Sequence, residues 1–258
     1  MLSRWISAFQ NDPKSMFISL AIEIPALLLA LILHEISHGY VALWCGDGTA
    51  KMMGRLSLRP SHHLDPIGSL CMVLLGFGWA KPVPVNPRNY RHYVRDDFFV
   101  SIAGITMNML LFVFSSLMLT FLTVYNLKYQ SYAPYFLSCK YEAFYIVYSF
   151  TGDTDVSMYF KYEWLLYIQH FFAYFSLLNL GLALFNFLPI PPLDGFHIFN
   201  DILLKGKLRL TPQLFRICQV ALLALCYMTN IVGNLISKAQ VAIQSGLING
   251  LTGIFGIG

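Results

Sequence analysis

The sequence of 258 residues is 57% hydrophobic and only 12% charged, whereas about a quarter of the residues in an ordinary soluble domain are charged. This composition excludes a soluble globular protein and predicts an integral membrane protein that crosses a lipid bilayer several times. The net charge of +4 is spread along the chain without a basic run between aromatic residues, so no nucleic-acid partner is expected.

Four apolar segments are long enough to cross about 30 Å of hydrocarbon as helices. In chain order they are predicted at about Phe17–Trp44, Phe98–Val124, Leu165–Leu188 and Leu214–Ile236. A fifth apolar stretch, Pro66–Ala80, is shorter and contains three glycines. The five cysteines form no closely spaced pair, which favours buried hydrophobic roles over a disulfide framework or a structural zinc site.

The end of the first segment carries the motif His34-Glu35-Ile36-Ser37-His38. Residues four apart share one face of a helix, so His34 and His38 can bind one metal ion, with Glu35 beside it to take a proton from a bound water. Two satisfied core histidines with an accidental glutamate between them are the alternative. Ionisable groups are costly at membrane depth and mark functional sites there, so the metal site is favoured.

A catalytic zinc takes three protein ligands and leaves one position for water. The candidate third ligand is Asp194, which follows the third helix in Pro189-Ile190-Pro191-Pro192-Leu193-Asp194-Gly195, where prolines end the helix. His34 and Asp194 reach the same side only if the first and third helices run parallel, which requires one crossing between them. The second helix supplies that crossing, so Pro66–Ala80 is predicted to be re-entrant rather than spanning.

The distribution of Lys and Arg predicts the orientation of the chain. In this topology ten of them fall in segments 45–97 and 189–213, and six fall in the exterior parts. The excess predicts that the face with the metal site is cytoplasmic. The predicted fold is an all-α polytopic membrane protein with about four transmembrane helices, a re-entrant segment and a small membrane-associated β-hairpin element on the cytoplasmic side. Residues 1–258 are expected to form one membrane-embedded domain, with its core at about 17–204 and a C-terminal helix and tail at 205–258.

With three further motifs, the histidine motif resembles the site-2 protease family of intramembrane zinc metalloproteases, and specifically its minimal bacterial and archaeal members. The resemblance covers about Ala30 to Leu203. The matching stretches are His34–Gly39, Gly54–Leu58 followed by His63–Pro66, Gly78–Pro87 and Asn186–Gly195. One departure follows Ala103-Gly104, where many relatives have Pro and this chain has Ile105, which predicts altered packing without loss of metal chemistry.

The resemblance implies a peptide hydrolase of regulated intramembrane proteolysis, in a bacterial cell membrane, that binds one Zn²⁺ per chain. It implies that the substrate is a transmembrane protein or peptide, cleaved near the cytoplasmic end of its membrane segment. His34, His38 and Asp194 would be the zinc ligands, Glu35 the catalytic residue that activates a zinc-bound water, and Asn186 a positioner of the substrate backbone. No PDZ-like insertion or appended regulatory domain fits in 258 residues, as expected for a minimal member.

Three alternatives stay open at the level of sequence. Gly76 and Gly78 expose backbone groups that an extended substrate can pair with as an added strand, but a tight turn needed only for re-entry explains them equally well. The aromatic loop Leu127–Glu163 is interpreted as an interfacial loop, with a substrate gate as the alternative. A catalytically idle relative that binds transmembrane segments is the alternative to an enzyme, and the presence of Glu35 with all three ligands favours the enzyme.

Overall fold

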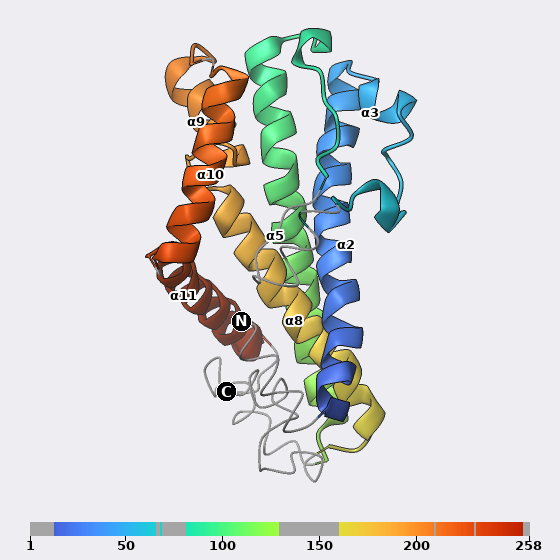
Figure 1. The fold of residues 1–258 in the computed structure, drawn as a ribbon. Coiled ribbons are helices and arrows are strands. Elements are labelled where there is room, and N and C mark those ends of the chain that lie inside the picture. Colours follow the sequence, from blue (N-terminus) through green and yellow to red (C-terminus); the bar gives the residue numbers. More distant parts are fainter. Residues whose placement is uncertain are drawn as a thin grey trace. The chain divides into compact units, whose positions relative to one another are not determined.

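The computed structural model describes residues 13–65, 68, 81–128, 160–208, 210–229 and 231–254 (Figure 1). Its helices are α2 (Pro13–Cys45), α3 (Thr49–Met52), α5 (Tyr93–Asn126), α8 (Glu163–Asn186), α9 (Asp194–Leu204), α10 (Pro212–Met228) and α11 (Ile231–Ile254). Two 3₁₀ turns, η1 (Pro60–His62) and η2 (Pro87–Asn89), each begin at a proline. The described residues are mostly helical, as predicted. They contain no strand, although Leu127 and Phe160 form an isolated bridge, so the β-hairpin stays a prediction.

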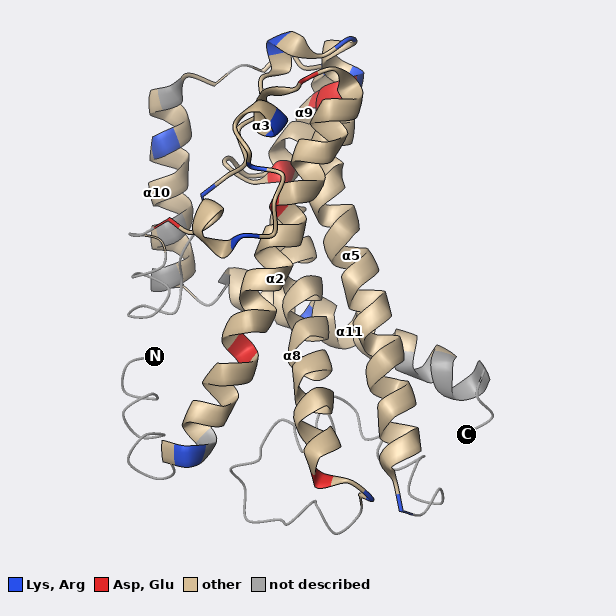
Figure 2. Cartoon of the chain, turned by 90° about the vertical axis from the view of Figure 1, so that its right-hand side faces the viewer, with Lys and Arg blue, Asp and Glu red and all other residues tan. Residues whose placement is uncertain are grey.

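Three of the described helices are long and apolar enough to cross a membrane. The candidate spans are Met16–Cys45, Tyr93–Asn126 and Glu163–Asn186. At 1.5 Å per residue, even the 24 residues of the shortest one reach about 36 Å. Charged residues lie mainly at helix ends and in the connecting segments (Figure 2). These spans agree with the first three predicted helices and confirm the integral membrane class.

The fourth predicted helix, Leu214–Ile236, is wrong as a single element because the chain breaks near its middle. α10 ends at Met228 and α11 begins at Ile231. Thr229 has an extended backbone, and its N–H and its Oγ1 both donate to the carbonyl oxygen of Leu225, at 3.0 and 2.8 Å. The Thr side chain competes with helical backbone bonding, so Thr229 ends the helix. How often this part of the chain crosses the bilayer stays a prediction.

The chain divides into two compact units. Of the described residues, the first contains those within 28–109 and 181–236, and the second contains those within 13–27, 110–180 and 237–254. The organisation of residues 1–258 as one functional domain stays a prediction.

In the first unit, the start of α5 lies beside the end of α2. Arg91 N–H donates to the carbonyl oxygen of Cys45 at 3.1 Å, and Ala42 packs against Tyr90 and Val100. Higher numbers on one helix therefore pair with lower numbers on the other, and α2 and α5 run antiparallel. A second apolar cluster joins Ile105 of α5 to Ala183 of α8 and Ile198 of α9. α5 thus contacts both the helix that carries the histidines and the segment that carries Asp194.

In the second unit, polar side chains join α5 to α8 within the apolar helices. Ser116 bonds Ser176 through their hydroxyls at 2.8 Å, and Asn126 Nδ2 donates to Gln169 Oε1 at 3.2 Å. The pairing again runs in opposite directions along the two helices, so α5 and α8 are antiparallel. Hydrogen bonds of this kind hold helices together in lipid, where the hydrophobic effect does not.

Two predicted elements fall largely outside the described residues. Of the predicted re-entrant segment Pro66–Ala80, only Gly68 is described, and its N–H donates to Asp65 Oδ1 at 2.7 Å. Gly76 and Gly78 both belong to the part outside. The loop Leu127–Glu163 is described only at its two ends. Re-entry and gating therefore stay predictions.

Candidate metal centre

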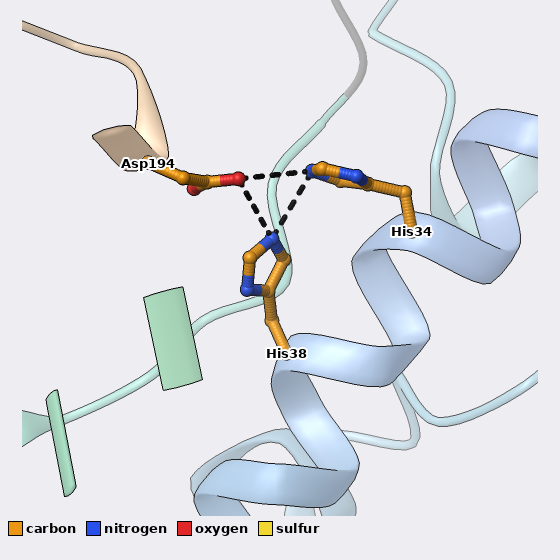
Figure 3. A group of neighbouring side chains, drawn as sticks. All are labelled: His34, His38 and Asp194. Atoms are coloured by element: carbon orange, nitrogen blue, oxygen red, sulfur yellow. Dashed lines mark hydrogen bonds and ion pairs between the residues drawn. The ribbon is translucent and has the colours of Figure 1, made fainter. Parts of the chain in front are cut away.

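The two histidines of the motif lie one turn apart on α2 and point the same nitrogen toward one place (Figure 3). His34 Nε2 and His38 Nε2 are 3.1 Å apart, as expected for residues at i and i+4 of a helix. The His34 side chain is buried, and that of His38 is nearly so. The helix alone therefore brings two ligand atoms together.

Asp194 completes the group from the first turn of α9. Its Oδ2 lies 3.3 Å from His34 Nε2 and 3.4 Å from His38 Nε2 (Figure 3). α9 can begin here because the next residue is Gly195: a Cβ on it would lie 2.4 Å from the carbonyl oxygen of Phe187. The glycine lets the chain fold back tightly after α8 and deliver the carboxylate to α2.

The three side chains form a donor set that suits a zinc ion. Their ligand atoms all lie within 4.8 Å of one another, and the group is the one cluster of its kind among the described residues. Two imidazoles and one carboxylate, without a fourth protein ligand in that group, match a catalytic zinc rather than a structural one. Burial opposes ionisation of Asp194, but His38 and His34 outweigh it and hold the pKa of the Asp194 carboxyl well below its usual range. The carboxylate is therefore charged.

Glu35 is held by the backbone of the segment that precedes α5. Its Oε2 accepts a hydrogen bond from the N–H of Val83 at 2.9 Å. That segment is fixed by Arg55, whose Nη2 donates to the carbonyl oxygens of Lys81 and Pro82 at 2.9 and 3.1 Å. Arg55 is itself buried. A guanidinium with several donors in a fixed plane suits such a clamp, and the clamped segment in turn holds the Glu35 carboxylate through Val83.

One face of α5 covers the other side of the histidine pair. Val100 accepts at its carbonyl oxygen from His38 Nδ1 at 2.7 Å, and Asn108 Nδ2 lies 3.1 Å from His34 Nδ1. Gly104 lies midway between these two residues on the helix. We did not identify these contacts from the sequence, although a glycine and an asparagine four residues apart in an apolar helix were a visible signal.

Replacing Gly104 with Ala should strongly reduce zinc binding. The added Cβ would lie 2.4 Å from His38 Nε2 and 2.5 Å from His34 Cε1, so the rings would have to move apart. The measurement is zinc per chain in the purified protein, by elemental mass spectrometry. Gly233→Ala is the matched control, because nothing lies within 4 Å of a Cβ at that helical glycine. Full zinc content in Gly104→Ala would contradict the close contact.

The remaining predicted site residues are only partly placed by the structure. Asn186 is the last residue of α8, half-buried and eight positions before Asp194, and its role stays a prediction. Gly76 and Gly78 lie outside the described residues. The structure thus brings together His34, His38 and Asp194.

A second polar cluster follows the site along α9. His197 Nδ1 lies 3.2 Å from Asp97 Oδ2, and Asp201, one turn further, is buried near Asp97. Burial and, after it, the negative charge of Asp97 raise the pKa of Asp201 to about 7. Asp201 is therefore largely protonated below neutral pH.

Replacing Asp201 with Asn should stabilise the protein more at pH 8 than at pH 5. An aspartate in the unfolded chain has a pKa near 3.9, so between about pH 4 and 7 the folded protein binds a proton that the unfolded chain has released. Stability is therefore lost as the pH rises through this window, and a neutral amide removes the loss. The measurement is the apparent melting temperature of wild type and variant in detergent. A difference between them that does not grow with pH would contradict the raised pKa.

Comparison with known proteins gives two matches. The chain matches peptidase family M50 over residues 22–228. It is 34% identical over 180 residues to the Bacillus subtilis (strain 168) protein named "Putative zinc metalloprotease YwhC", an alignment that covers 70% of this chain and 68% of that protein. No solved structure gives a significant match.

Proposed function

This chain belongs to peptidase family M50, the site-2 protease family, and is a zinc metallopeptidase of the membrane; we propose that it is an intramembrane endopeptidase that hydrolyses a peptide bond in or near the transmembrane segment of a membrane protein. The observation that carries the proposal is the convergence of His34 and His38 with Asp194, from two parts of the chain far apart in sequence. The histidines belong to a helix apolar enough to span the bilayer, which supports a substrate that is itself in the membrane.

His34 Nε2, His38 Nε2 and Asp194 Oδ2 are the atoms that would hold the zinc. When bound there, zinc supplies a Lewis acid that polarises the scissile carbonyl and makes water more acidic. The protein's part is to keep the three atoms together. The α-helix sets the histidine spacing, and the turn at Gly195 brings in the carboxylate. Val100 fixes the His38 ring from behind, through its carbonyl oxygen.

Glu35 acts as the general base and then the general acid. The Val83 N–H holds Oε2, which leaves Oε1 as the atom that takes the proton from the attacking water. The same carboxyl then passes that proton to the leaving amine nitrogen as the peptide bond breaks. Because a backbone N–H fixes the position of this carboxylate, both proton transfers can occur without a rearrangement of the surrounding chain.

The site faces the cytoplasm of a bacterial cell in this proposal. The end of α2 and the start of α5 lie on one side, joined by the Arg91 to Cys45 hydrogen bond, and Asp194 reaches the histidines from the end of α8. This supports the parallel course of α2 and α8. The excess of Lys and Arg in segments 45–97 and 189–213 supports cytoplasmic placement. A relative from Bacillus subtilis supports a bacterial membrane.

Substrate selection depends on groups that bind an unwound peptide. A helical substrate keeps its carbonyls hydrogen-bonded, so it has to be extended before hydrolysis. We assign Asn186 to bind the backbone of that extended segment with its side-chain amide. We assign Gly76 and Gly78 to present backbone groups that pair with the segment as an added strand.

Metal removal tests the proposed activity. The purified protein in liposomes is incubated with a panel of single-span membrane proteins, and products are followed by gel electrophoresis. Treatment with 1,10-phenanthroline should abolish cleavage and added zinc should restore it, whereas the non-chelating isomer 1,7-phenanthroline should have no effect. Cleavage that persists after zinc has been removed from the protein would contradict a zinc endopeptidase.

A further inference from the structure

We propose that Asn108 is a positioning residue for the zinc ligand His34: its side-chain oxygen Oδ1 accepts a hydrogen bond from His34 Nδ1–H and so fixes the ring with Nε2 toward the metal. This inference rests on the proposed function, in which His34 Nε2 binds zinc. It extends that function to a residue of α5 that touches neither substrate nor metal.

Asn108 lies fully buried against the histidine pair. Its side chain is the polar group that faces His34 Nδ1, with Nδ2 at 3.1 Å. Its oxygen Oδ1 is also buried, and no donor in the described part of the chain bonds to it. A buried amide oxygen without a hydrogen-bond donor destabilises the fold, so a partner for Oδ1 is expected.

The tautomer of His34 supplies that partner. A metal ion takes the lone pair of Nε2, so the neutral ring must carry its proton on Nδ1. An NH₂ group cannot accept that proton, but a carbonyl oxygen can. Rotation of the amide by a half-turn about its last side-chain bond exchanges Nδ2 and Oδ1. Oδ1 then accepts from His34 Nδ1–H, which gives both the ring proton and the amide oxygen a partner, while Nδ2 takes the place that Oδ1 occupied.

His38 shows the same arrangement with an acceptor that cannot be exchanged. Its Nδ1 lies 2.7 Å from the carbonyl oxygen of Val100, which can only accept. His38 Nδ1 must therefore carry the proton, and its Nε2 is free for the metal. Val100 and Asn108 are eight residues apart on α5, and Gly104, midway between them, lies close against both histidine rings. Asn108 thus serves for His34 as the backbone carbonyl serves for His38.

The zinc affinities of Asn108 variants test this role. Zinc binding to the purified protein in detergent is measured by competition with a colorimetric chelator. Asn108→Leu, which removes the acceptor, should weaken zinc binding by about 10- to 100-fold, the usual effect of losing a partner of a ligating histidine. Asn108→Asp keeps an acceptor of the same size and should bind zinc within a few-fold of wild type.

Asn179→Leu is the matched control. Asn179 is also a fully buried asparagine in an apolar helix, and its amide donates to the carbonyl oxygen of Phe175 on its own helix. Its replacement should leave zinc affinity unchanged even if it lowers the melting temperature. Equal losses of zinc affinity in Asn179→Leu and Asn108→Leu would show a general packing effect and overturn the proposal.

Failure of this inference can be told from failure of the proposed function. If wild type binds one zinc and cleaves in a zinc-dependent way while Asn108→Leu binds zinc as tightly, only the role of Asn108 is overturned. If wild type binds no zinc, both fall. If Asn108→Leu does not fold, ¹⁵N NMR spectra of the histidine side chains in zinc-loaded wild type and Asn108→Asp test the proposal instead. A hydrogen-bonded Nδ1 proton on His34 supports the proposal, and its absence overturns it.

Discussion

Replacing Glu35 with Gln is expected to slow peptide-bond hydrolysis by about 10²- to 10⁴-fold, the usual contribution of a general base. The amide of glutamine has the same size but cannot take a proton from the attacking water. Its carbonyl oxygen can still accept the Val83 N–H, so the local structure should stay intact. Initial cleavage rates of wild type and variant in liposomes measure the effect, with zinc per chain measured on the same samples.

The zinc content separates a chemical defect from a structural one. Glu35→Gln should keep its zinc, since its ligand atoms are those of His34, His38 and Asp194. Glu163→Gln is a suitable control, because Glu163 is exposed at the start of α8. This variant should cleave at the wild-type rate. A Glu35→Gln protein that is as fast as wild type would show that another group takes the proton.

Replacing Asp194 with Ala is expected to reduce zinc to background and to abolish cleavage. The carboxylate is the only negatively charged member of the ligand group, and two neutral histidines alone hold zinc weakly. Zinc per chain is again measured by elemental mass spectrometry, together with the melting temperature to exclude unfolding.

Asp201→Asn provides the comparison on the same helix. Asp201 is also buried, seven residues further along α9, but it belongs to the cluster with Asp97 and His197 rather than to the ligand group. It should keep one zinc per chain. An Asp194→Ala protein that retains its zinc would mean that a different residue supplies the third ligand.

The main helices and the approach of His34 to His38 could be predicted from the sequence because each depends on a local pattern. Long uncharged runs predicted α2, α5 and α8, and the i, i+4 spacing predicted the approach of His34 to His38. Asp194 lies far from them in sequence. Its position beside the histidines could be predicted because helix ends can meet only on the same side of a membrane. The number of membrane crossings between the two segments was therefore enough, without any knowledge of tertiary contacts.

The contacts that surround the ligands could not be predicted in this way. The bond from His38 to Val100 involves a backbone oxygen, which any residue would offer at that position. The contact of Asn108 with His34 depends on the register between α2 and α5, which is set by packing along both helices. The hold of Val83 on Glu35 depends on the clamp by Arg55, more than twenty residues earlier. The break at Thr229 was missed because the apolar run continues across it.

The most direct test of the central claim is the position of the cut in a substrate. Wild-type protein in liposomes is given single-span membrane proteins of known sequence, and both new termini of each product are identified by mass spectrometry. We predict a cut within the apolar segment or at its cytoplasmic end, absent after zinc removal and in Glu35→Gln. Zinc-dependent cuts found only in the water-exposed parts of these substrates would contradict intramembrane proteolysis.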